Sequence, residues 1–193
     1  MHLPSVTTIS SGAFFHHYKL EELYITSQAI TSLPAWFLQS CYYLNTLSVP
    51  FSGTGVQTGA SSFLGVLFNN TTSIGETDPR YLSSVYSGSS YYLLPKSLNK
   101  VIINRQTTIP EQTFHLLYYV REIELSEATT VGQLAFYNCD GLKKVKMDKV
   151  TTLGDRVFEE CDGLETLTLP SVTIISEKAF YRCRNLHEIV IHY

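Results

Sequence analysis

A repeat of 22 residues is the feature that most constrains what this 193-residue chain can fold into. The block VTTLGDRVFEECDGLETLTL (150–169) aligns without a gap with VTIISEKAFYRCRNLHEIVI (172–191), and ATTVGQLAFYNCDGLKKVKM (128–147) precedes both at the same offset. The alignment brings two sets of residues into register: Phe136, Phe158 and Phe180, and Cys139, Cys161 and Cys183. Self-similarity at this period is typical of solenoids, in which stacked units bury a common core.

Three segments nearer the amino terminus keep the pattern with substitutions. They span residues 6–25, 29–49 and 108–125. The aromatic position holds Phe14, Leu38 and Phe114 in these segments, and the cysteine position holds His17, Cys41 and Leu117. In 29–49 we place Leu38, and not its neighbour Phe37, in the aromatic position, because only this alignment keeps the later apolar residues in phase.

Each copy closes on a Leu-x-x-Leu-x-Leu pattern, which predicts one strand per repeat. The seven predicted strands end at residues 25, 49, 103, 125, 147, 169 and 191. The last two apolar positions lie two residues apart and therefore share the inward face of a strand, whereas the residues between them face outward. Because one unit cannot bury its apolar set alone, the units must stack and pair their strands in a parallel sheet. The pairs Asp140-Gly141 and Asp162-Gly163 predict turns ahead of the strands.

These residues carry a resemblance to a known family. The pattern of Ala-Phe or Val-Phe followed three residues later by Cys, and then by Leu-x-x-Leu-x-Leu, resembles the BspA-like leucine-rich repeats. The resemblance implies a right-handed leucine-rich-repeat solenoid, with a parallel β-sheet on one side and short turns, 3-10 or helical segments on the other. It also implies a noncatalytic role in binding or adhesion, in a cell-surface or secreted protein.

One repeat is about 32 residues too long, because the second and third predicted strands end 54 residues apart. The excess lies in a Tyr-, Gly- and Ser-rich insertion at 50–97, where Gly88 between two tyrosine-bearing stretches predicts a hairpin. Two interpretations stay open. In one, an apolar stretch simply rebuilds the stretched repeat: Phe63, Leu64, Val66, Leu67 and Phe68. In the other, four tyrosines form a recognition surface, because tyrosine offers large contact area at low entropic cost: Tyr81, Tyr86, Tyr91 and Tyr92.

The outward positions of the strands form a second candidate surface. One column reads Tyr24, Ser48, Ile102, Glu124, Lys146, Thr168 and Val190, and we select Tyr24, Glu124 and Lys146 as candidate binding residues. Two neighbouring columns alternate partly in charge: Arg121, Lys143, Glu165 and His187, and Glu122, Lys144, Thr166 and Glu188. Such charge ladders either stabilise neighbouring strands modestly or form the binding site of the solenoid.

Several classes of function find no support in the sequence. A net charge of -3 without a basic block argues against a nucleic-acid partner, and no apolar run is long enough to span a membrane. No signal peptide is apparent at the amino terminus. The four cysteines recur once per repeat, which favours a column of buried thiols over a metal site or disulfides. No nucleophile has activating neighbours, so we predict no enzyme activity, no metal site and no cofactor.

The ends of the sequence resemble interrupted repeats. Leu3 aligns with the last apolar residue of a strand whose earlier part is absent, and Tyr193 follows the last strand directly. We therefore expect residues 1–193 to be a single leucine-rich-repeat domain from a longer chain. The leading hypothesis is a noncatalytic module that binds a protein or glycan at a cell surface or in secreted form. The alternatives are a structural spacer and an intracellular protein-interaction scaffold.

Overall fold

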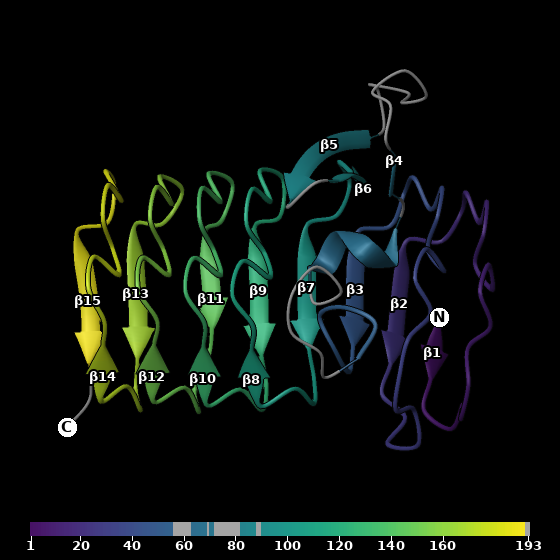
Figure 1. Ribbon diagram of the computed structural model, residues 1–193, viewed down its shortest axis with the longest axis horizontal. Coiled ribbons are helices and arrows are strands. Elements are labelled where there is room, and N and C mark those ends of the chain that lie inside the picture. Colours follow the sequence, from purple (N-terminus) through teal and green to yellow (C-terminus); the bar gives the residue numbers. More distant parts are fainter. Residues whose placement is uncertain (56–62, 69, 72–81, 88–89, 192–193) are drawn as a thin grey trace.

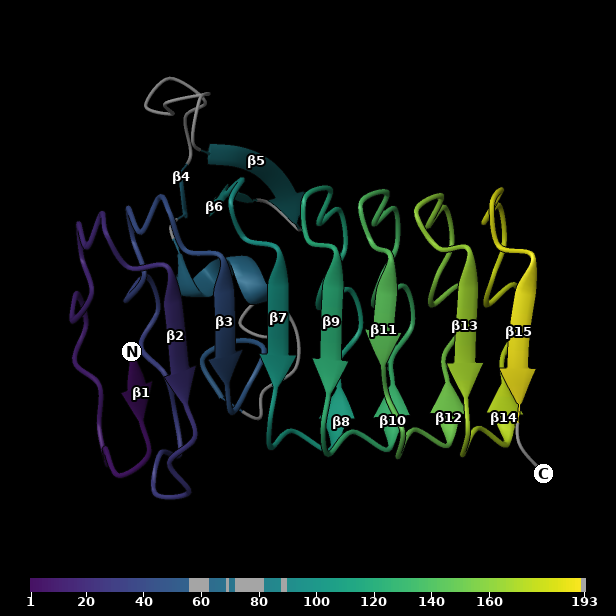
Figure 2. The ribbon, with the colours of Figure 1, turned by 180° about the vertical axis from the view of Figure 1, so that it is seen from behind.

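The chain forms a parallel β-solenoid of about seven turns. The computed structural model describes residues 1–55, 63–68, 70–71, 82–87 and 90–191. Successive turns lie side by side along the long axis, with the two termini toward opposite ends (Figures 1 and 2). The solenoid predicted from the repeat is therefore confirmed.

Seven strands, one from each repeat, lie next to one another on one side of the solenoid (Figure 1). They are β2 (Glu22–Ile25), β3 (Thr46–Val49), β7 (Lys100–Ile103), β9 (Glu122–Leu125), β11 (Lys144–Lys146), β13 (Thr166–Leu169) and β15 (Glu188–Ile191). A short strand β1 (His2–Leu3) pairs with β2 and places Leu3 opposite Ile25. All seven predicted strands are present, and β11 ends one residue before the predicted boundary.

The strands pair so that residues equivalent in the 22-residue alignment lie opposite each other. The first six strands in the order β1-β2-β3-β7-β9-β11 form one hydrogen-bonded parallel sheet, and β13 pairs with β15 beside it. Val101 lies opposite Ile123, and Ile123 opposite Val145, so equivalent residues of neighbouring repeats stack directly. Alternation puts these apolar side chains on the inward face, where Val101 and Ile123 are fully buried.

A second, smaller sheet was not predicted from the sequence. Its strands are β8 (Thr108–Ile109), β10 (Thr130–Val131), β12 (Thr152–Leu153) and β14 (Ile174–Ile175), which lie at the lower edge of Figure 1. Each strand has two residues, too few for an alternating pattern to stand out. Their hydrogen bonds nevertheless join four successive repeats, and threonine hydroxyls add to them: Thr151 and Thr173 each donate to the carbonyl of the threonine 22 residues earlier.

The segments between the strands are turns with left-handed residues, not α-helices. In the regular repeats two residues four positions apart have positive φ, as at Leu134 and Asn138. The same spacing recurs at Gln112 and Leu116, at Arg156 and Glu160, and at Lys178 and Arg182. Because a right-handed helix needs consecutive negative φ values, these positions prevent helix formation. Within the described ranges the one helical element is the 3-10 helix η2 (Leu64–Leu67).

The predicted turns before the strands are present, and one of them depends on a close approach of two backbones. Asp140 and Gly141 lie in the turn that leads to β11. A Cβ atom at Gly141 would overlap the carbonyl oxygen of Tyr118 in the previous repeat. A side chain at residue 141 would therefore push this turn away from its neighbour, and glycine avoids that.

Aromatic side chains form a stacked column inside the regular repeats. The ring centroids of Phe136 and Phe158 lie 4.8 Å apart in nearly parallel planes, and Phe114 and Phe180 extend the stack. Phe14 donates its backbone amide to the carbonyl of Phe37, in the same way that Phe136 donates to Val157. Residue 38 is thus the equivalent of Phe158, which confirms the shifted alignment of Leu38.

The cysteine column is buried except at Cys183, which is half-buried, and its thiols donate hydrogen bonds. Cys139, Cys161 and Cys183 donate to the carbonyl oxygens of Phe114, Phe136 and Phe158 at 2.9, 2.9 and 2.8 Å. Cys41 makes the equivalent contact with Phe14 at 3.2 Å. All four cysteines are free, so the predicted column of buried thiols is confirmed. The thiol is more than an apolar filler, because it adds a hydrogen bond between neighbouring repeats, to a carbonyl that also accepts a backbone amide of its own repeat.

The insertion contains both an extension of the core and a hairpin. Phe63, Leu64, Leu67 and Phe68 are buried, and Leu38 donates its backbone amide to the carbonyl of Leu67. Leu64 in turn donates to Thr113, so this stretch rebuilds the turn between two regular repeats as predicted. Strands β5 (Leu82–Ser87) and β6 (Ser90–Pro95) form the predicted antiparallel hairpin, and β4 (Asn70–Thr71) pairs with the other edge of β6. The hairpin lies at the amino ends of the solenoid strands, along the upper edge of Figure 1.

Candidate functional site

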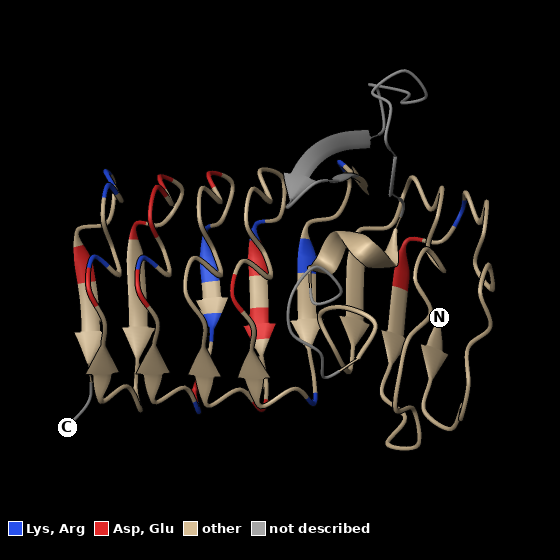
Figure 3. Ribbon diagram, in the orientation of Figure 1, with Lys and Arg blue, Asp and Glu red and all other residues tan. Residues whose placement is uncertain are grey.

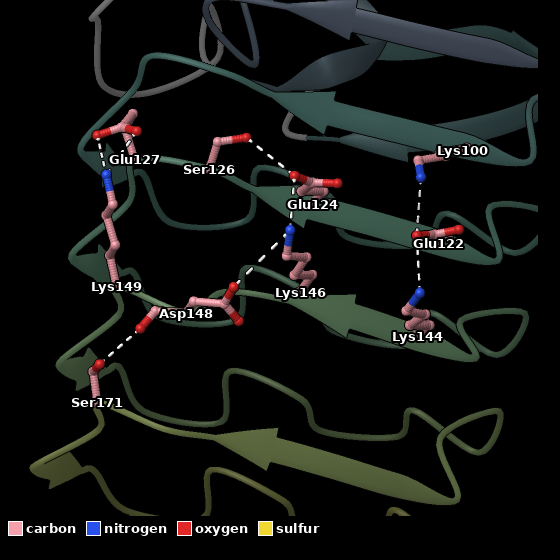
Figure 4. Close-up of polar contacts among 10 residues, drawn as sticks. All are labelled: Lys100, Glu122, Glu124, Ser126, Glu127, Lys144, Lys146, Asp148, Lys149 and Ser171. Carbon is pink, nitrogen blue, oxygen red and sulfur yellow. Dashed lines mark hydrogen bonds and ion pairs between the residues drawn. The ribbon is translucent and has the colours of Figure 1, made fainter.

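The outward face of the strands carries charged residues that alternate in sign from β7 to β9 to β11 (Figure 3). Glu122 lies between two lysines of the neighbouring strands, 3.0 Å from Lys100 and 3.4 Å from Lys144 (Figure 4). Lys143 pairs with Glu165 at 3.8 Å. The alternation predicted from the sequence is therefore present, and Lys100 extends it by one strand.

The position of Glu122 changes its pKa. Partial burial by itself would raise the pKa of this carboxyl, but the hydrogen bonds and positive charges of Lys100 and Lys144 outweigh burial and hold the pKa below its usual value. Glu122 is therefore ionised throughout the neutral range. Ion pairs of this kind, partly open to solvent, contribute about 0.2–1 kcal/mol each to stability.

Two of the selected candidate residues, Glu124 and Lys146, are brought together by the structure. Their charged atoms lie 3.4 Å apart, and Lys146 also lies 4.0 Å from Asp148 (Figure 4). Ser126 donates its hydroxyl to Glu124. A ligand at this place would meet a salt-bridged cluster with a shallow hollow of about 120 Å³ beside it.

Tyr24 is separate from this cluster. Its ring stacks on the ring of His2 at a centroid distance of 4.4 Å, and strands β3 and β7 lie between it and Glu124. The expectation that the whole column from Tyr24 to Val190 is outward and open needs correction at Ser48, which is buried. Asn104 covers it, since its amide donates both to the Ser48 hydroxyl and to the carbonyl of Ile25. The column of outward residues is therefore divided into two parts, one on each side of Ser48.

The four candidate tyrosines of the insertion differ in their placement. Tyr81 lies outside the described residues. Tyr86 and Tyr91 are opposite each other across the β5–β6 hairpin. Tyr92 is 4% exposed, and its ring packs 4.9 Å from that of Phe63 in the core. Burial removes Tyr92 from any surface, because its ring already serves to pack the insertion onto the solenoid.

Burial makes the cysteine thiols poor nucleophiles and poor metal ligands. Burial raises the pKa of Cys41 to about 11 and that of Cys183 to about 12. Since the thiolate is the nucleophile and metal ligand, both thiols are unreactive near neutral pH. Within the part of the chain that the structure describes, no three histidine, cysteine or acidic side chains gather in a way that could hold a metal ion. The helices of that same part include none long and apolar enough to cross a membrane.

Three solved structures of leucine-rich proteins are similar to this chain. A leucine-rich cell surface protein from Faecalibacterium prausnitzii A2-165 shares 20% identity over 98% of this chain, with a TM-score of 0.46, and the chain spans 64% of that protein. A leucine-rich repeat protein from T. pallidum shares 18% identity over 60% of this chain and 81% of its own, with a TM-score of 0.38. One from Bacteroides ovatus shares 16% over 88% of this chain and 54% of its own, with a TM-score of 0.40.

Comparison by sequence gives a more direct result. No curated protein matches the chain. The family of BspA type leucine rich repeat regions matches in six copies, over residues 1–78 and 85–193. These ranges include all seven strands of the large face and the stacked aromatic and cysteine columns. The chain therefore belongs to the BspA-type leucine-rich repeat family.

Proposed function

We propose that this chain is a noncatalytic recognition module of a cell-surface or secreted protein, and that it binds a protein or a glycan. The observation that carries the proposal is that each strand has an inward face, which forms the core, and an outward face, which does not. Inward residues such as Leu47, Val101 and Ile123 are fully buried, whereas outward residues such as Lys146 and Thr168 take no part in the core. The repeat thus maintains a rigid array whose outward side chains are available for recognition.

Two surfaces are the candidates for contact. One is the strand face around Glu124 and Lys146, where fixed ion pairs give a defined pattern of charge. The other is the β5–β6 hairpin with Tyr86 and Tyr91, which departs from the repeat and lies at one edge of it. Insertions in solenoids commonly form part of the binding face.

An intracellular scaffold is a second candidate, favoured by one observation. All four cysteines are free, and free thiols suit a reducing compartment. Burial and their role as hydrogen-bond donors explain the same thiols equally well in an oxidising one. The scaffold would share the binding surfaces but meet different partners.

The test is a binding screen of the intact chain followed by paired variants. The biotinylated chain is applied to arrays of purified extracellular matrix proteins and of defined glycans, and each hit is measured by surface plasmon resonance. We expect the pair Tyr86→Ala and Tyr91→Ala, or the pair Glu124→Ala and Lys146→Ala, to weaken the hit by about tenfold or more, as for residues central to an interface.

The matched control is Arg184→Ala, which removes an exposed ion pair with Asp162 outside both surfaces. It should bind as the unaltered chain does. Absence of any hit on both arrays, with the chain folded by circular dichroism, would favour the structural spacer and overturn the recognition function.

A further inference from the structure

A hollow of about 350 Å³ lies where the insertion meets the strand face, and neither candidate surface includes it. Lys96 and Ser97, which follow β6 directly, form one wall. Asn99, Arg121 and Lys143 form another, at the positions just before β7, β9 and β11. The volume is in the range of about 300–1,000 Å³ that small-molecule sites occupy.

The charge of the hollow is its most distinctive property. Lys96, Arg121 and Lys143 contribute three cations, and the residues that line the hollow include no carboxylate. The chain as a whole has a net charge of -3. A concave surface focuses the field of charges that share one sign, so this place attracts anions although the molecule repels them.

Two donors in the hollow are without partners. Within the ranges that the structure describes, the guanidinium of Arg121 and the side-chain amide of Asn99 make no hydrogen bond or ion pair. Lys143 keeps only its 3.8 Å contact with Glu165, where both side chains are more than half exposed. Arginine binds carboxylates with two parallel hydrogen bonds, and this geometry is open here.

The remaining wall provides flat apolar surface and fixed polar groups. Tyr118 and Tyr119 are 37% and 45% exposed, and the ammonium of Lys96 lies 5.6 Å from the centroid of the Tyr119 ring. Ser97 is held by hydrogen bonds from its hydroxyl to the carbonyls of Tyr42 and Leu44. The site is therefore built by the fold, with a cation held over one of its aromatic rings.

We infer that this hollow, here called the Arg121 pocket, binds a carboxylate-bearing sugar unit, either free or within an acidic polysaccharide. Arg121 and Lys143 receive the carboxylate, the Asn99 amide bonds a hydroxyl, and the tyrosine rings cover the apolar face of the sugar ring. Exposed tyrosine side chains beside an amide favour a sugar over an acidic peptide. The inference rests on the proposed recognition function and names its ligand class.

Isothermal titration calorimetry of the intact chain tests the pocket with tetragalacturonate, galacturonate and the neutral methyl ester of the tetramer. We expect the tetramer to bind, binding to weaken as salt is added, and the neutral ester not to bind. Arg121→Gln and Lys143→Gln should each weaken binding by about tenfold or more, as loss of a charge-assisted hydrogen bond does. Binding of the single sugar identifies a free ligand, whereas binding of the tetramer alone identifies a polymer; both support the inference.

The control variant is Lys149→Gln, an exposed lysine paired with Glu127 away from the pocket, which should leave binding unchanged. Equal melting temperatures exclude unfolding as the cause of any loss. Equal binding of the neutral ester, tighter binding of hexaglutamate than of the tetramer, or no binding by any acidic sugar would overturn the inference. If array hits persist in Arg121→Gln while acidic sugars fail to bind, the pocket is wrong and the recognition function stands.

Discussion

At the scale of single residues, the cysteine position shows why a repeat keeps one chemical group. Cys161 is fully buried, and its thiol donates to the carbonyl of Phe136 in the previous repeat at 2.9 Å. Sequence alone indicates an apolar buried side chain at this position, because Leu117 occurs there in one repeat. Only the structure shows that the thiol adds a second hydrogen bond to this carbonyl, which also accepts from the backbone amide of Cys139 within its own repeat.

Replacement of Cys161 separates these two contributions. Cys161→Ala removes the hydrogen bond that the thiol donates to the Phe136 carbonyl and leaves a small void, at a cost of about 1–3 kcal/mol in the free energy of unfolding. Cys161→Ser keeps a donor, so we expect it to be more stable than the alanine variant. Urea unfolding followed by circular dichroism measures both. A serine variant less stable than the alanine variant would show that apolarity alone matters.

At the scale of elements, neighbouring strands are joined by charges as well as by backbone hydrogen bonds. Glu122 on β9 bridges Lys100 on β7 and Lys144 on β11. Other pairs of the same 22-residue spacing lie at the turns, such as Arg182 with Glu160 and Arg184 with Asp162. A change in one column of the sequence therefore acts on the contact between two elements.

Glu122→Gln tests this bridge through its pH dependence. Because the folded state lowers the pKa of Glu122, the ion pairs add stability above the usual pKa of 4.5 and lose it as pH falls through the lower folded value. We expect the variant to be less stable by up to about 1 kcal/mol at pH 7 and equal to the unaltered chain near pH 3. Urea unfolding at the two pH values gives the comparison.

The matched control is Glu165→Gln, whose partner Lys143 lies 3.8 Å away with both side chains well exposed. Its effect on stability should be small at either pH. An unchanged difference between Glu122→Gln and the unaltered chain at pH 3 would exclude the charge as the cause.

At the scale of the whole molecule, contacts connect each turn with its neighbours, so stability is a sum of local terms. Phe136 is fully buried between Phe114 and Phe158, and its replacement affects those two repeats first. The amino-terminal repeats lie several turns away along the axis (Figure 1).

Phe136→Ala should therefore unfold the solenoid locally before it unfolds globally. We expect a loss of about 3–5 kcal/mol, with faster amide exchange in β9, β11 and β13 and unchanged exchange in β2 and β3. Hydrogen exchange measured by mass spectrometry resolves these segments. Phe15→Ala, which removes a ring that is 48% exposed, is the control. A uniform rise in exchange along the chain would contradict the additive description.

The sequence by itself determined the period, the seven strands, the aromatic and cysteine columns and the hairpin of the insertion, because each depends on a pattern repeated or bounded along the chain. Only the tertiary structure decided which candidate residues are accessible. Asn104 covers Ser48, and the ring of Tyr92 packs against Phe63 in the core. The Arg121 pocket was also beyond the sequence: the repeat aligns Arg121 with Lys143, but Lys96 belongs to the insertion, and only the structure brings it to them. A periodic pattern fixes which way a side chain points, whereas access to it depends on neighbours that are distant in the chain.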